Sequence, residues 1–350
     1  MIIHLLDRDI FMKSDKVKLS IVLPVYNVER YLRECLDSIY SAGIESFEVI
    51  AVNDGSTDGS LAILLEYKEK CENLIIVDQE NKGLSGARNS GLEKVSGEFV
   101  FFLDSDDILT KGVSVLKYIE QIVECDIFMF DALEFIDDIS NGILESDTFR
   151  NEKIEGYPIK HYASIEIGHG LGNSGPIKSV SLKGVDYLNI LKKNDHYIPV
   201  VWRRIYRSRF IKENMLSYVI DVSPAEDDLF MFESLLLNPS IVYFNVPVVL
   251  YRRRGDSISG NNDRIRNYNS YSIVLSELLK WKKMRDSFQQ PEILNWIFDV
   301  FIRRKYRERS TIREALQLIE FSRRSGIRIY FSSYLKIGAR LLKNLVLSSK

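Results

Sequence analysis

The chain has 350 residues, of which 45% are hydrophobic and 27% are charged, and its formal net charge at pH 7 is −2. This is the composition of an ordinary globular protein, and the length predicts about two domains. No stretch reaches the roughly 20 apolar residues of a membrane span, and three scattered cysteines exclude a disulfide framework or a zinc site and are typical of a reducing cytoplasm.

Residues 1–16 are expected to form a flexible leader. Asp7, Arg8 and Asp9 interrupt the apolar run that a signal peptide requires. Met12 is an alternative start of the chain.

Strands and helices alternate from residue 18 to residue 103. Continuous apolar runs predict buried strands, and apolar residues at helical spacing predict the helices between them. Asn27 is placed to cap the first helix. The alternation is typical of an α/β fold with a doubly wound, mostly parallel sheet flanked by helices. The predicted strands are Lys18–Tyr26, Phe47–Val52, Leu74–Val77 and Phe99–Leu103, and the predicted helices are Asn27–Ser41, Ser60–Glu72 and Leu84–Val95.

Polar residues follow three of these strands, at the carboxyl ends where such sheets bind ligands. The clusters are Pro24–Asn27, Asn53–Ser56 and Asp104–Asp107. The last cluster holds three carboxylates directly after an aromatic strand, and a divalent cation, Mg²⁺ or Mn²⁺, would neutralise them there. The alternative interpretation is a solvated acidic turn that caps the next helix.

A dinucleotide-binding domain is disfavoured at its most specific feature. That domain carries a glycine-rich G-x-G-x-x-G turn after its first strand. The corresponding turn in this chain is PVYNVE, residues 24–29, which contains no glycine.

The pattern is less regular beyond the first four strands. Asp126–Phe130 and Ile241–Val249 predict further strands. Residues 137–199 are polar and predicted to be irregular, as in a substrate-facing insertion or a lid. Residues 226–237 predict a helix that opens with three acidic residues, EDD.

Charge is distributed unevenly along the chain. From Tyr251 to Lys350 there are 22 Lys and Arg against 9 Asp and Glu, a net charge of +13, which leaves −15 for residues 1–250. The basic region indicates an anionic partner, such as membrane headgroups or a lipid-linked phosphate. Nucleic acid is disfavoured because no binding motif is present. The region is predicted to be helical from about Ser270, and Ile327–Leu347 is either a helix lying on a membrane or one packed on the body.

Five segments, taken together and in this order, resemble family 2 of the inverting glycosyltransferases, which are nucleotide-sugar enzymes of the GT-A fold. The resemblance implies a nucleotide-sugar-binding half over residues 17–125, an acceptor-binding half over 126–260 and a basic helical region over 261–350. The segments are SIVLPVYNVERYLRECLDSI (20–39), VNDGSTDGS (52–60), NKGLSGARNSGLEKVSGEFVFFLDSDD (81–107), AEDDLF (225–230) and YRRRGDSIS (251–259).

By motif, the resemblance implies a nucleoside pocket formed by the first strand ends. Pro24 and Tyr26 line it, and Asp54 accepts a hydrogen bond from the uracil ring. Lys82 and Arg88 belong to the segment that contacts the base and the ribose. Asp54 as a structural helix cap, and Arg88 as the partner of a carboxylate on the body, are the alternatives.

The resemblance further implies a site for the sugar diphosphate. Asp104 and Asp106 hold the sugar and a metal that bridges the diphosphate, and Asp107 supports them or caps the next helix. Arg252 and Arg254 resemble the loop that closes over the diphosphate, where the fixed fork of arginine suits phosphate oxygens.

Asp227 matches the general base of the family. Its neighbours Glu226 and Asp228 leave a shift by one position open, and acids that complement the helix macrodipole are the alternative. Relatives often carry lysine where this chain has Arg204, so Arg204 is assigned no role.

The implied reaction is transfer of a hexose from a UDP-sugar to an acceptor hydroxyl, with inversion and with Mn²⁺ or Mg²⁺ as cofactor. The expected acceptor is a lipid-linked saccharide of the undecaprenyl-diphosphate type in capsule or O-antigen synthesis. The expected location is the cytoplasm, peripheral on the inner face of the plasma membrane, with a homo-oligomer as an open possibility. A non-catalytic module that binds nucleotide or glycan is the alternative. A cytidylyl or uridylyl transferase is disfavoured because it needs a glycine-rich basic loop after the first strand.

Overall fold

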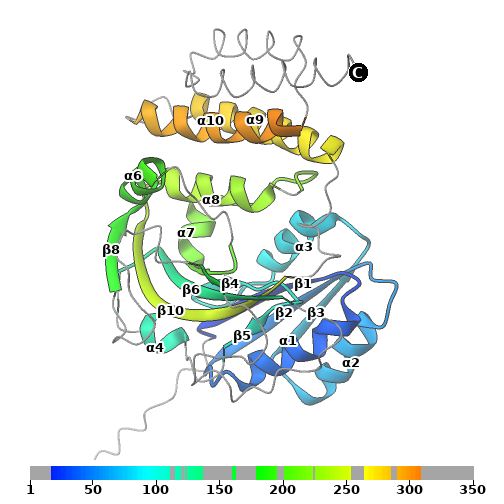
Figure 1. Ribbon diagram of the computed structural model, residues 1–350. Helices are drawn as coiled ribbons and strands as arrows, with labels where there is room; N and C mark the ends of the chain where they lie inside the picture. Colours follow the sequence, from blue (N-terminus) through cyan, green and yellow to red (C-terminus); the bar gives the residue numbers. More distant parts are fainter. Residues whose placement is uncertain are drawn as a thin grey trace, which may run out of the picture.

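We analysed a computed structural model of the chain (Figure 1). It describes residues 17–110, 115–119, 122, 124–136, 160–162, 179–194, 201–223, 225–253, 264–284 and 290–308. Arg254, most of the predicted insertion over 137–199 and the helix predicted over Ile327–Leu347 lie outside these residues.

The first half of the chain forms the predicted parallel sheet. The strands are β1 (Leu19–Val25), β2 (Phe47–Asp54), β3 (Leu74–Gln79) and β4 (Phe99–Phe102), in the order β3-β2-β1-β4. All seven residues of β1 are buried, because β1 is central and both faces of the sheet are covered by helices. The helices between these strands are α1 (Glu29–Ser41), α2 (Ser60–Lys70) and α3 (Gly83–Leu92).

The sheet continues from β4 without a break but becomes mixed. β4 pairs antiparallel with β9 (Arg204–Arg207), which also pairs antiparallel with β6 (Ile127–Ile136). β6 pairs parallel with the long strand β10 (Ser240–Arg253), whose register shifts on either side of Pro247. Three short strands, β5 (Ile108–Leu109), β7 (Lys160–Tyr162) and β8 (Ser179–Lys183), complete the sheet along β10 and β6.

Helices cover the two faces of the sheet in separate groups (Figure 1). α1, α2 and α4 (Val115–Ile119) lie on one face, and α3, α6 (Gly184–Asn194), α7 (Ser208–Glu213) and α8 (Glu226–Leu236) lie on the other. α9 (Arg264–Met284) and α10 (Pro291–Glu308) form a further layer over α8. In the described part of the chain, no helix combines the length and the apolar character that crossing a membrane would require.

Alternate residues of each central strand face different cores. Phe101 belongs to the core beneath α1, whereas Phe102 belongs to the core beneath α3 and α8, as the two-residue period of a strand requires. Gly91 lets α3 approach the sheet closely, because a Cβ at this position would lie 2.4 Å from Val22 Cγ1.

Two local predictions are corrected by the structure. Asn27 does not cap α1: it has a positive φ of 51° and its Oδ1 accepts a hydrogen bond from the Thr57 N–H (2.8 Å). The start of α1 is instead capped from the next loop, where Ser60 Oγ accepts from the Val28 N–H (3.0 Å) and Asp58 Oδ2 from the Glu29 N–H (3.0 Å).

The second correction concerns the segment predicted to be irregular. Residues 179–194 form β8 and α6, and Tyr187, Leu188 and Leu191 of α6 are buried in the core shared with α8 and α10. These three residues recur at helical spacing in the sequence, but the residues around them are polar, so the sequence predicts an irregular segment.

Candidate active site

The strand ends that carry polar residues lie along one edge of the sheet. β2, β1 and β4 are parallel neighbours. Asp54 is the last residue of β2, and Tyr26 and Asp104 follow β1 and β4 at the same edge. This arrangement is the one predicted from the alternation of strands and helices.

Asp54 closes the loop between β3 and α3. It is buried, and its Oδ1 accepts hydrogen bonds from Gln79 Nε2 (2.7 Å) and from the backbone N–H of Lys82 (2.9 Å). The next residue, Gly55, has a φ of +72° and packs so closely that a Cβ would lie 2.9 Å from the backbone nitrogen of Asn81. Asp54 therefore has a structural role, and its expected contact with uracil stays a prediction.

The other nucleoside-side residues differ in exposure. Tyr26 is 50% exposed and Lys82, at the start of α3, is also exposed, so both side chains reach solvent beside the strand ends. Pro24 is buried inside β1, opposite Val52 of β2. Its expected place in the pocket wall stays a prediction.

Arg88 of α3 is buried and binds two acidic residues from distant parts of the chain. Its Nη2 donates to Asp104 Oδ1 (2.9 Å) and its Nη1 donates to Asp227 Oδ1 (2.6 Å). Only 1% of the side chain is exposed, and the Cζ atom lies 5.2 Å from the centre of the Tyr218 ring. Burial alone would lower the pKa of Arg88, but Asp227 and Asp104 raise it above its usual value. Arg88 is thus the counter-ion of both acids, as the alternative interpretation of the sequence had it.

Asp227 and Glu226 open helix α8 beside this arginine. Burial raises the pKa of Asp227 to about 6. The positive charge of Arg88 lowers this pKa, and the negative charge of Asp104 raises it further. Burial together with Asp227 raises the pKa of Glu226 to about 8. Glu226 Oε1 lies 3.7 Å from Arg88 Nη1, and its Oε2 has no hydrogen-bond partner in the described part of the chain. Burial therefore raises the pKa of both neighbouring acids, Glu226 and Asp227.

The second oxygen of Asp227 is held more loosely than the first. Oδ2 lies 3.5 Å from the backbone nitrogen of Val201, at the limit of a hydrogen bond. Asp227 can therefore keep its contact with Arg88 through Oδ1 and accept a proton at Oδ2.

The loop after β4 separates the roles of its three aspartates. Asp104 and Asp106 are partly exposed, with 27% of the Asp104 side chain accessible. Asp107 is fully buried, and its Oδ1 accepts from the backbone N–H of Arg252 (2.8 Å). Burial and the neighbouring acids Asp106 and Asp104 raise the pKa of Asp107 well above its usual value. Asp107 thus ties the loop after β4 to the backbone near the carboxyl end of β10.

Arg252 is held by a backbone oxygen, an acidic side chain and two aromatic rings. Its Nε donates to the backbone oxygen of Asp106 (2.8 Å), and its Nη2 pairs with Glu34 of α1. The guanidinium carbon also lies 5.0 Å from the ring centre of Tyr31 and 4.8 Å from that of Phe135. This geometry favours a structural role, so contact of Arg252 with a diphosphate stays a prediction.

Sequence reasoning missed three residues of this site. From the sequence, Glu34 looks like an ordinary charge on the solvent side of α1, and Tyr218 lies in a loop without periodicity. Arg204 was assigned no role, although it is completely buried and lowers the pKa of Asp227. Their partners lie far away in sequence, and a single sequence carries no local signal for such pairs.

Comparison with known proteins identifies the family. Residues 20–174 match the model described as Glycosyl transferase family 2. The chain is also 31% identical over 245 residues to glycosyltransferase GlyA of Streptococcus pneumoniae serotype 4, a match that covers 69% of this chain and 31% of that protein. The chain belongs to glycosyl transferase family 2.

A second curated relative of this family 2 chain is the poly(ribitol-phosphate) beta-N-acetylglucosaminyltransferase TarS of Staphylococcus aureus. It is 27% identical over 248 residues, which cover 69% of this chain and 37% of TarS. The chain thus spans about a third of the length of these two curated relatives.

The solved structures show the fold of this family 2 chain. The crystal structure of S. aureus TarS residues 1–349 in complex with UDP-GlcNAc superposes with a TM-score of 0.59 at 20% identity, covering 94% of this chain and 92% of that one. The fold is therefore the GT-A fold, with an α/β architecture and one curled, mixed sheet.

In this glycosyltransferase-family chain, the loop after β4 suits a divalent metal whose remaining coordination positions are filled by a bound ligand. No group of three metal-binding side chains exists among the described residues. Mg²⁺ is commonly held by one or two carboxylates plus substrate phosphates. The partly exposed carboxylates of Asp104 and Asp106 provide that donor set, with one oxygen of Asp104 bound to Arg88.

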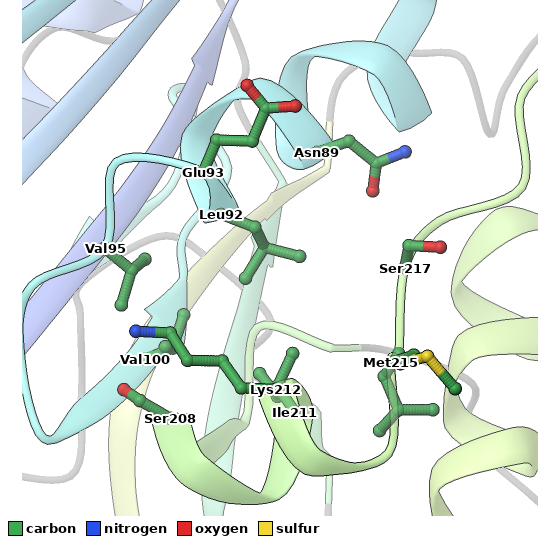
Figure 2. A pocket seen from close by; sticks show the side chains of 11 residues that line it. Asn89, Leu92, Glu93, Val95, Val100, Ser208, Ile211, Lys212, Met215 and Ser217 are labelled. Carbon is green, nitrogen blue, oxygen red and sulfur yellow. The ribbon is translucent and has the colours of Figure 1, made fainter.

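A cavity of about 380 Å³ is lined by residues of α3, of α7 and of the loop that follows α7 (Figure 2). Leu92, Val100 and Ile211 form its apolar floor, and Asn89 and Ser217 lie at its border. The cavity separates α3 from α7 and from the loop that follows α7. Two of the residues that line the cavity, Asn89 and Ser217, are the sequence neighbours of Arg88 and Tyr218.

Proposed function

We propose that the chain transfers a hexose from a UDP-sugar to a hydroxyl group of an acceptor, with inversion at the anomeric carbon. The observation that carries the proposal is the Arg88 bridge, which brings Asp104 and Asp227 to one guanidinium although they are far apart in sequence. One acid belongs to the strand ends expected to bind the donor, and the other belongs to the helix expected to carry the base.

The donor side is supported by the strand ends and by the relatives. The exposed Tyr26 and Lys82 flank the edge where parallel sheets bind ligands. S. aureus TarS, which shares the fold, was crystallised with UDP-GlcNAc. A UDP-hexose of the Glc, Gal or GlcNAc type is therefore the proposed donor.

Asp227 is the proposed general base. A base works best when its pKa lies near the working pH, and burial brings the pKa of Asp227 to about 6. In the proposed step the acceptor hydroxyl gives its proton to Asp227 Oδ2 while its oxygen forms a bond to the anomeric carbon. The bond from that carbon to the UDP oxygen breaks, and its electron pair leaves with the diphosphate. One base and attack from the opposite face give inversion.

The charge of the leaving diphosphate has to be neutralised. Asp106 and Asp104 would hold the Mn²⁺ or Mg²⁺ ion, which supplies positive charge to the diphosphate when bound. Arg254 and Arg252 stay candidates for further contacts, and the Arg252 contacts with Glu34 and Asp106 place its guanidinium beneath the same loop.

The proposed acceptor is a lipid-linked saccharide used in the synthesis of a bacterial surface polysaccharide such as capsule or O-antigen. The basic region from Tyr251 onward, with a net charge of +13, would bind anionic lipid headgroups at the inner face of the plasma membrane. TarS is named for transfer to poly(ribitol-phosphate), which is likewise an anionic acceptor.

The test measures product mass after incubation with a panel of UDP-sugars, Mn²⁺ and a synthetic diphosphate-lipid saccharide. We expect one hexose to be added by the wild type and none by Asp227→Asn, whose affinity for UDP should stay within about twofold. Asp126→Asn is the control, because Asp126 binds Ser240 at the start of β10, the end of that strand opposite Arg252.

Two results would contradict the proposal. Binding of UDP without transfer or hydrolysis of any donor would support the non-catalytic module instead. Loss of UDP binding in Asp227→Asn would show that Asp227 maintains the nucleotide site and is not the base.

A further inference from the structure

The loop that follows α7 reaches the Arg88 guanidinium through one aromatic ring. Tyr218 is 2% exposed, and its ring centre lies 5.2 Å from Arg88 Cζ. The same ring is stacked on Phe230 of α8, with ring centres 4.4 Å apart and planes at 6°. The Tyr218 ring therefore lies between the arginine of α3 and the helix that carries Asp227.

Asn89 fixes this loop to α3. Its Nδ2 donates to the backbone oxygen of Tyr218 (2.8 Å), and its Oδ1 accepts from the backbone N–H of Tyr218 (2.8 Å). The two bonds use both backbone groups of one residue, so they define the position of the Tyr218 Cα relative to α3. Asn89 directly follows Arg88 in α3, so the residue that anchors the Tyr218 backbone is the sequence neighbour of the residue that the Tyr218 ring contacts.

The ring of Tyr218, and not its hydroxyl, makes the contact with Arg88. The hydroxyl is buried and has no hydrogen-bond partner in the described part of the chain. A buried hydroxyl without a partner costs free energy, so the described residues around this hydroxyl do not favour tyrosine over phenylalanine.

Arg88 needs an orienting contact of this kind. Its Nε is buried and has no hydrogen-bond partner among the described residues. The two Nη atoms each bind an acid, but two bonds from the outer nitrogens leave the plane of the group free to tilt with the acids. A ring face against the guanidinium fixes that plane through cation–π attraction.

We propose that Tyr218, anchored by Asn89, is a positioning residue that sets the plane of the Arg88 fork and thereby the place of Asp227 relative to Asp104. The inference rests on the proposed function, in which Asp227 is the base. It adds a role for two residues outside the expected donor, metal and base sets.

The expected effect is on turnover and not on donor binding. Tyr218 and Asn89 contact Arg88 and α3, whereas the expected nucleoside contacts lie at the strand ends. A displacement of about 1 Å at a catalytic group can cost about 100-fold in rate. We therefore expect Tyr218→Leu to lower kcat by about 10- to 100-fold, with the KM for the UDP-sugar and the Kd for UDP changed by less than about twofold.

The experiment compares kcat, KM and UDP affinity of the full chain in three variants. Tyr218→Phe keeps the ring and should restore wild-type turnover. Phe128→Leu is the matched control, because it truncates a fully buried aromatic residue in the core on the other face of the sheet. It should lower the thermal unfolding temperature without lowering kcat.

Asn89→Ala tests the anchor independently and also serves if Tyr218→Leu does not fold. It should lower kcat as Tyr218→Leu does, and the double variant should lose no more than either single variant, because both changes release the same ring. Asn73→Ala is its control, since Asn73 also ties a loop to a backbone oxygen, that of Phe47 (3.1 Å), at the other end of the sheet.

Three results would overturn the inference. The first is a wild-type kcat in both Tyr218→Leu and Asn89→Ala. The second is a rise in KM or in the Kd for UDP that accounts for the loss of activity. The third is a loss of kcat in the double variant that equals the sum of the two single losses in free energy. Failure of the proposed function is distinguishable, because then the wild type itself transfers no sugar.

Discussion

At the scale of single residues, one buried cation determines how the acids of the site behave. Arg88 neutralises part of the charge of Asp104 and Asp227. Glu226 lies 3.7 Å from Arg88, and its second oxygen has no hydrogen-bond partner among the described residues. An ionised carboxylate without a counter-charge is costly when buried. The cluster therefore couples the protonation of Glu226 to the stability of the fold.

The stability of the protein is predicted to fall as the pH rises. The pKa of Glu226 is raised from 4.5 in an ordinary setting to about 8, so its contribution is fully present below pH 4.5 and is lost as the pH rises through 8. Glu226→Gln removes this ionisation and should raise the unfolding temperature at pH 9 by a few degrees, with little change at pH 4, where the side chain is protonated in both the folded and the unfolded protein. Thermal unfolding followed by circular dichroism at both pH values measures the difference.

The control for this experiment is Glu72→Gln, a change at a surface acid beyond α2. It should leave the pH dependence unchanged. An equal gain of Glu226→Gln at pH 4 and pH 9 would show that the effect does not come from ionisation.

Asp106 is predicted to be required for metal-dependent binding of UDP. Its carboxylate is partly exposed at the strand ends, whereas that of Asp107 is buried and occupied by the backbone of Arg252. Asp106→Ala should lower the affinity for UDP in the presence of Mn²⁺ by at least about tenfold and have no effect after chelation. Isothermal titration calorimetry with Mn²⁺ and with EDTA measures both values, and equal affinities for both proteins in Mn²⁺ would refute the metal role.

At the scale of elements, the regular part of the fold was readable from the sequence. The buried parallel strands β1, β2 and β4 are continuous apolar runs, and the structure confirms them within two residues at each end. Their carboxyl ends meet at one edge because parallel neighbours run in the same direction. The convergence of the polar clusters therefore follows from local patterns alone.

Contacts between distant segments could not be predicted in this way. The α1 cap comes from Asp58 and Ser60, the Arg88 partner Asp227 is 139 residues away, and Arg252 binds a glutamate 218 residues away. Each side chain has an adequate local explanation as a turn, a base contact or a solvated charge. Only the packing of the elements selects the actual partner.

Close packing of α3 on β1 is predicted to depend on Gly91. A Cβ at this position would lie 2.4 Å from Val22 Cγ1, and crowding of this kind costs about 1–3 kcal/mol. Gly91→Ala should lower the free energy of unfolding in urea by about this amount, despite the better helix propensity of alanine.

Ser90→Ala, on the same helix, is the control for helix propensity and should not destabilise the protein. Val22→Ala makes room for the new methyl group, so the double variant should be more stable than the sum of the two single changes. A stabilising effect of Gly91→Ala alone would show that α3 can move away from the sheet at no cost.

At the scale of the whole molecule, the two expected halves share one sheet. β9 lies between β4 and β6, and β5, which belongs to the first half in sequence, pairs with β10 of the second. The order of strands in space is not encoded in local periodicity. The division at residue 125 therefore stays a proposal about ligand contacts, since the hydrogen bonding of the sheet crosses it.

A fragment of residues 17–125 is predicted not to fold alone. It would expose one edge of β4 and would lack the partner of β5, and the apolar residues of β4 would lose the cover of α7 and α8. Circular dichroism and amide exchange should show no cooperative unfolding, in contrast to the full chain. A folded fragment that binds UDP would show that the donor half is independent.

The Arg88 bridge also bears on how inhibitors should be designed. A positively charged sugar mimic designed to bind Asp227 would compete with the Arg88 guanidinium, which already donates a hydrogen bond to Asp227 Oδ1. Such a compound must compete with a group that is covalently part of the chain and cannot diffuse away. We therefore expect uncharged acceptor mimics joined to a diphosphate to be better starting points than cationic ones.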